Sequence, residues 1–156
     1  MKPCSRSEMI FETGPLPMEY GARLNRPKLL ALGSYRGLGF AVQNMSGKFP
    51  YAYVDVSGTS FESCPYQRLD VEVYGGLSYS GNEIATVIGG WWLGWDYAHD
   101  GDLIFCKVVG GKGGCAKLFN GVQYTTEKII EDCASVIDQL LKKEKTRKPE
   151  HANLKA

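Results

Sequence analysis

The sequence predicts an α+β fold, in which a mostly antiparallel sheet carries one long C-terminal helix on one of its faces. Two observations lead to this prediction. Several short runs between residues 29 and 96 alternate apolar with polar residues, which is the period of a strand with one buried face. Residues 125–141 instead repeat their apolar side chains every three or four positions, as an amphipathic helix does.

A single domain over residues 28–143 is the simplest organisation, because a chain of 156 residues can bury a core without a metal or a disulfide. Residues 1–27 contain four prolines and keep no sustained period, so we expect an irregular N-terminal arm or a short strand with loops. Residues 144–156 are charged, include Pro149 and have almost nothing to bury. They predict a disordered tail.

The first predicted strands are residues 29–35 and 38–42. Residues 44–50 have the composition of a turn, and residues 51–56 alternate as a third strand. The period of two also predicts which face each side chain occupies. In residues 38–42, Leu38, Phe40 and Val42 share one face. In residues 51–56, Ala52, Val54 and Val56 lie on one face, and Tyr51, Tyr53 and Asp55 lie on the other.

A polar loop over residues 57–67 precedes the next alternating segment. Residues 69–74 are predicted to form a strand with their apolar side chains inward and Asp70, Glu72 and Tyr74 on the opposite face. The glycine pair at positions 75 and 76 then permits a bulge or sharp bend.

The tryptophan-rich strand predicted over residues 87–96 holds all three tryptophans and runs into an acidic turn. A period of two separates its side chains into two sets: Trp92, Gly94 and Asp96 on one side, and Trp91, Leu93 and Trp95 on the other. Residues 103–109 and 115–119 are two further strand candidates, joined by a glycine-rich turn.

The predicted helix begins at Thr125 or Thr126, either of which can cap its first turn, and Glu127 suits the positive end of the helix dipole.

Composition excludes several classes of protein. Eighteen basic and seventeen acidic residues give a net charge of +1, too little positive charge for general nucleic-acid binding. The five cysteines are odd in number and form no CxxC pair, which favours reduced thiols in a cytoplasmic compartment. No signal peptide or membrane span is expected.

Asp96, His99 and Asp102 form the first candidate site. Their three-residue spacing aligns them on one side of a helical turn or gathers them around a tight loop. A histidine flanked by carboxylates suits acid–base chemistry, and the same trio could ligate a divalent cation. The alternative is that Asp96 caps a loop and His99 bonds to the backbone. Neither a cofactor nor a metal is predicted firmly.

A second set of candidate ligand-binding residues surrounds this trio. Trp92 shares the side of Asp96, so it could be a stacking wall for a base or sugar, although packing under the helix is an equal alternative. Ser78 and Tyr79 follow the paired glycines in a loop whose hydroxyls and amides could meet a phosphate. Glu72 and Tyr74 lie just before that loop.

Four stretches carry a resemblance. They are Tyr-Ala-Tyr-Val-Asp-Val at 51–56, Asp-Val-Glu-Val-Tyr-Gly-Gly-Leu-Ser-Tyr-Ser-Gly at 70–81, Trp-Trp-Leu-Gly-Trp-Asp-Tyr-Ala-His-Asp-Gly-Asp at 91–102 and the helix at 131–140. Together these stretches resemble a widespread family of small, functionally uncharacterised bacteriophage and prophage proteins. The family pattern has a histidine before Gly-Gly, where this chain has Tyr74. The resemblance covers residues 51–140 and implies no activity.

The favoured functional hypothesis is a phage-encoded protein in the host cytoplasm that captures a small polar ligand. A nucleotide signal of host antiviral defence is one plausible ligand, sequestered rather than converted. The second hypothesis is a small hydrolase or lyase that uses Asp96, His99 and Asp102. The third is a protein–protein inhibitor of a host enzyme. Homo-oligomerisation is left open.

Overall fold

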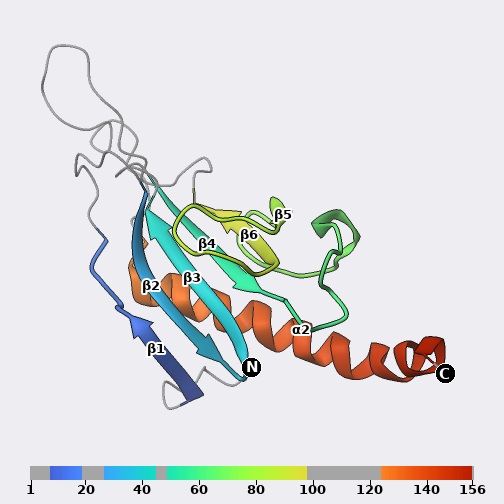
Figure 1. The fold of residues 1–156 in the computed structure, drawn as a ribbon. Coiled ribbons are helices and arrows are strands. Elements are labelled where there is room, and N and C mark those ends of the chain that lie inside the picture. Colours follow the sequence, from blue (N-terminus) through green and yellow to red (C-terminus); the bar gives the residue numbers. More distant parts are fainter. Residues whose placement is uncertain (1–7, 19–26, 45–48, 98–123, 156) are drawn as a thin grey trace, which may run out of the picture.

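The computed structural model describes residues 8–18, 27–44, 49–97 and 124–155, with side chains to residue 146. In this part of the chain, six strands form one antiparallel sheet and helix α2 lies across one face of it, which confirms the α+β class (Figure 1). The strand order is β1-β2-β3-β4-β6-β5. The elements are β1 (Met9–Thr13), β2 (Lys28–Tyr35), β3 (Leu38–Asn44), β4 (Pro50–Asp55), β5 (Tyr79–Gly81), β6 (Trp92–Asp96) and α2 (Thr126–Lys155).

The main core lies between the sheet and α2, and the predicted alternation decides which side chains enter it. Phe40 and Val42 of β3 and Val54 of β4 are fully buried on this face. The buried face of the helix packs against them with Ile129, Ile130, Cys133, Val136, Ile137 and Leu140. The face assignments made for these strands and for the helix are therefore confirmed.

Helix α2 begins as the sequence predicts and ends later. The Thr125 hydroxyl accepts a hydrogen bond from the Lys128 amide at 3.2 Å, which satisfies one of the orphan donors of the first turn. The helix then continues to Lys155, through the segment for which the sequence predicts a disordered tail. Glu144 accepts a hydrogen bond from the Ser60 amide at 2.8 Å, so packing reaches at least this residue.

The N-terminal arm contributes a strand to the sheet. Residues of β1 pair antiparallel with β2, so β1 forms an edge of the sheet. The segment that follows is fixed to α2, because the Thr126 hydroxyl donates to the Leu16 carbonyl at 2.6 Å.

Two strand predictions need correction. Residues 69–74 alternate between half-buried and exposed side chains as predicted, yet they pair with none of the described strands. The Gln139 amide of α2 takes the place of a strand partner, because it accepts from the Glu72 N–H and donates to the Glu72 carbonyl, both at 2.7 Å. The tryptophan-rich strand is shorter than residues 87–96, since Gly89 and Gly90 adopt positive φ and delay its start to Trp92.

The strands predicted over residues 103–109 and 115–119 lie outside the described residues.

Candidate functional site

The face of the sheet opposite α2, called here the outer face, carries the candidate site. Tyr51 and Tyr53 of β4 and Trp92 of β6 lie on it, as their alternation predicts. They belong to a second apolar cluster, separate from the core under the helix. The outer face is therefore a packed aromatic surface rather than a solvated polar one.

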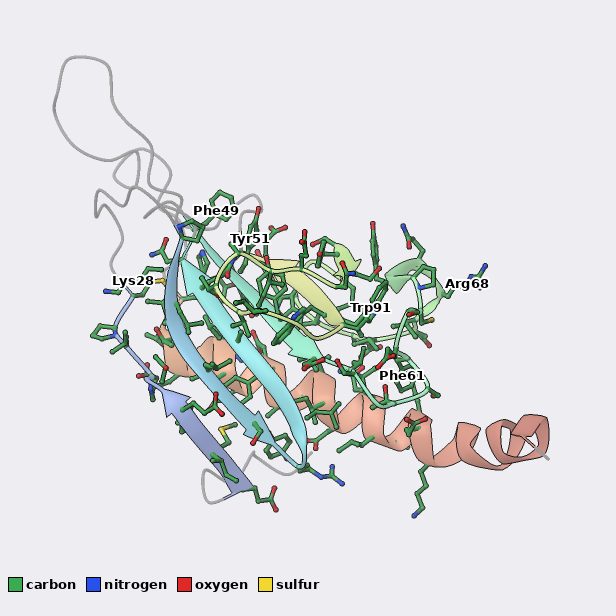
Figure 2. The ribbon with its side chains drawn as sticks, viewed as in Figure 1. Lys28, Phe49, Tyr51, Phe61, Arg68 and Trp91 are labelled. Atoms are coloured by element: carbon green, nitrogen blue, oxygen red, sulfur yellow. The ribbon has the colours of Figure 1, made fainter. Side chains whose placement is uncertain are left out.

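The aromatic rings of this face contact one another edge to face, with centroid separations typical of such pairs. Phe49 and Tyr51 lie side by side in Figure 2, with ring centroids 5.1 Å apart. Tyr51 meets Tyr53 at 6.2 Å. Tyr53 in turn meets Tyr79 at 6.0 Å and Trp92 at 6.5 Å, both nearly perpendicular. We call Tyr51, Tyr53 and Tyr79 the tyrosine row.

Gly94 is what allows Tyr53 to occupy the centre of this row. Tyr53 and Tyr79 are its cross-strand partners in β4 and β5. A Cβ at position 94 would lie 2.7 Å from two ring carbons of Tyr53, well inside normal contact. The absence of a side chain on β6 therefore gives the ring room to lie over the strand.

A pocket of about 270 Å³ opens beside the tyrosine row. Its lining consists of Tyr51, Tyr53, Ser78, Tyr79, Trp95 and Asp96. The Ser78 hydroxyl lies 3.5 Å from an Asp96 carboxylate oxygen, and the Ser78 amide donates to the Gly94 carbonyl at 2.9 Å. These contacts hold the segment before β5 against β6, so that a hydroxyl and a carboxylate share one wall.

Burial raises the pKa of two phenols at this pocket, which keeps Tyr51 and Tyr53 protonated and able to donate hydrogen bonds. Burial, followed by the Asp96 carboxylate, raises the pKa of Tyr51. Burial raises the pKa of Tyr53 further above its ordinary value, with smaller contributions from Tyr51, Tyr79 and Asp96. None of the described lining residues is basic. The pocket therefore suits a ligand that is neutral or cationic at the point of contact and that carries hydrogen-bond donors.

The structure brings three predicted site residues together. Ser78, Tyr79 and Asp96 line one pocket, although they come from two strands and the loop before one of them. His99 and Asp102 lie outside the described residues, so the proposed acid–base or metal trio stays a prediction.

Three other predicted site residues lie elsewhere. Trp92 is on the side of Asp96 but only 3 % exposed, and its indole N–H donates to the Gly89 carbonyl at 2.7 Å. It is thus neither an open stacking wall nor packed under the helix, because residues before β6 cover it. Tyr74 stacks on Tyr97 at 5.8 Å, and Glu72 lines a different cleft beside α2.

Tyr51 and Tyr53 are pocket residues that the sequence did not single out. Their alternation placed them opposite the core, which was the available signal. Their link to Asp96 depends on β4 pairing with β6, where Tyr51 faces Asp96 across the ladder.

Among the described residues, no group of three or more histidine, cysteine, aspartate or glutamate side chains is arranged to hold a metal ion. No helix in the described part of the chain has both the length and the apolar character that crossing a membrane requires. Comparison of the chain with protein-family models, with curated proteins and with solved structures gave no match.

Proposed function

We propose that this protein binds a small polar ligand at the tyrosine row and sequesters it rather than converting it. The observation that carries this proposal is the pocket itself, in which three tyrosines surround a serine hydroxyl and the Asp96 carboxylate. The proposed ligand is a molecule with a flat or sugar ring and several hydrogen-bond donors, such as the nucleoside part of a nucleotide signal.

Size and chemistry support a ligand of this class. Pockets for drug-sized molecules are about 300–1,000 Å³, so a pocket of about 270 Å³ suits one base, one sugar or a nucleoside. The Asp96 carboxylate can accept hydrogen bonds from ribose hydroxyls or from a base amino group. Aromatic side chains offer flat apolar surface to the same ligand at low entropy cost.

Phosphate groups of a nucleotide would have to extend away from this lining, because the described lining residues supply no cation to neutralise them. The role in phage counter-defence rests on the sequence resemblance and is part of the proposal. The hydrolase or lyase alternative uses Asp96, His99 and Asp102, and the last two lie outside the described residues.

Native mass spectrometry of the protein purified from cells tests the proposal. We expect a bound small-molecule mass that is released intact on denaturation and is depleted in Asp96→Asn. The control, Glu131→Gln, removes one carboxylate from an exposed position of α2 and should retain the ligand. Release of a cleaved product, or equal retention in both variants, would contradict sequestration at this pocket.

A further inference from the structure

A second cleft lies between the segment after β4 and the C-terminal half of α2. Its volume is about 620 Å³, and it shares no lining residue with the pocket at the tyrosine row. The lining consists of Phe61, Arg68, Leu69, Asp70, Glu72, Gln139, Lys142, Lys143 and Thr146. Figure 2 labels Phe61 and Arg68 on the segment that faces the helix. The cleft therefore has two walls, one from residues 61–72 and one from α2.

The helix wall is a single polar face. Gln139, Lys142, Lys143 and Thr146 are separated by three, four and seven positions, which places them above one another on one side of a helix. In this region α2 runs beyond the strands of the sheet (Figure 1). Two lysines thus lie on the side of α2 that lines the cleft.

The opposite wall is extended backbone with an unused pairing position. The Gln139 side-chain amide pairs with both the N–H and the carbonyl of Glu72. In an extended chain, residues two apart direct their backbone polar groups to the same side. The backbone groups of Asp70 therefore point toward the cleft, and within the described chain they make no hydrogen bond.

The two walls carry acidic and basic side chains that do not pair across the cleft. Asp70 and Glu72 stand on one wall together with Arg68, and Lys142 and Lys143 stand on the other. In the described part of the chain these two carboxylates and two lysines form no ion pair, although α2 does form one with Arg36 through Asp138 at 2.7 Å. A ligand that satisfies both walls carries a cation and an anion, and a strand-like ligand also uses the backbone of Asp70.

We propose that this cleft binds a short peptide with free termini, in an extended conformation alongside residues 69–72. The peptide carboxylate contacts Lys142 and Lys143, and its ammonium group contacts Asp70 or Glu72. Its backbone continues the pairing that Gln139 begins at Glu72, in the manner of strand addition. An apolar side chain contacts Leu69. An extended tripeptide spans about 10 Å, and the cleft volume lies within the range of small-ligand pockets.

The test is a solution NMR titration with a tripeptide mixture that has free ends and is randomised at the central residue. We expect saturable shifts of the amides of residues 68–72 and 139–146, with a dissociation constant below about 1 mM for the selected members. The same mixture with N-acetyl and C-amide ends should bind at least about tenfold more weakly, because both charge-assisted contacts are lost.

Charge reversal of the helix wall gives the matched comparison. Lys142→Glu combined with Lys143→Glu should abolish the shifts, whereas Lys145→Glu, an exposed lysine outside the lining, should leave them unchanged. Retained amide shifts elsewhere in the double variant verify its fold. The proposal is overturned if no free-ended peptide shifts these amides, if blocked and free peptides bind equally, or if the double variant binds as the unmodified protein does.

Discussion

Gly94→Ala is the substitution that most directly probes how the tyrosine row is built. An added Cβ would lie 2.7 Å from two ring carbons of Tyr53, about 0.7 Å inside the 3.4 Å at which ordinary contact begins. Tyr53 has little freedom to move aside, since it is only 9 % exposed and contacts Tyr51, Tyr79 and Trp92. Overpacking of this kind typically costs about 1–3 kcal/mol.

Urea denaturation followed by tryptophan fluorescence measures this cost, which corresponds to a fall in Tm of about 2–4 °C per kcal/mol for a chain of this size. Gly39→Ala is the matched control in β3, because its Cβ would lie 3.5 Å from the nearest atom, on Asp55. Relief of the glycine entropy cost makes that control neutral or stabilising by up to about 1 kcal/mol.

A double-mutant cycle isolates the contact itself. In a Tyr53→Ala background the added methyl at position 94 meets no ring, so the cost of Gly94→Ala should largely disappear. If Gly94→Ala is as stable as the unmodified protein, or costs the same with and without the Tyr53 ring, the reasoning about this site is refuted.

Three further predictions follow from the packing. Tyr97→Phe should lower the free energy of unfolding, measured in urea, by about 1–3 kcal/mol. The buried phenol accepts a hydrogen bond from the Trp95 indole at 3.0 Å, and that donor would lose its partner. An unchanged urea midpoint would contradict this. Burial raises the pKa values of Tyr53 and Tyr97 above the ordinary 10.0. The free energy of unfolding should therefore be highest below pH 10 and decline above it, because the phenols ionise more readily in the unfolded chain. Urea denaturation at about pH 8 and about pH 11 measures this, and equal stability at the two pH values would contradict it. Gln139→Ala should raise the hydrogen-exchange rate of the Glu72 amide by about tenfold, because it removes the oxygen that accepts from this amide at 2.7 Å. An unaltered exchange rate would show that this contact does not hold residues 69–74 in place.

Local pattern was enough to predict the sheet's central strands and the helix. In β4, Val54 alternates with Tyr53 and Asp55, and in β3 the larger apolar side chains Phe40 and Val42 recur at a spacing of two, so the period reports which side faces the helix. The same pattern misled at residues 69–74, because alternation does not report the hydrogen-bonding partner. There the partner is the side chain of Gln139, which lies 67 positions from Glu72.

The candidate site was predictable in part for the same reason. Ser78, Tyr79 and Asp96 stood out as polar groups near glycines and at a strand end, which are local signals. Tyr51 became a site residue only because β4 pairs with β6, with Tyr51 opposite Asp96. Strand order is a tertiary property, and no local period encodes it. The burial of Trp92 likewise depends on the segment that covers it.

The most direct test of ligand binding at the tyrosine row is an NMR titration of the full chain with adenosine, guanosine, cytidine and uridine, read at the ring protons of Tyr51, Tyr53 and Tyr79. The account predicts saturable shifts of these rings with at least one nucleoside, and their loss in Asp96→Asn but not in Glu131→Gln. If no nucleoside shifts these rings at millimolar concentration, or if the shifts persist in Asp96→Asn, the proposed nucleoside-type ligand at this pocket is contradicted.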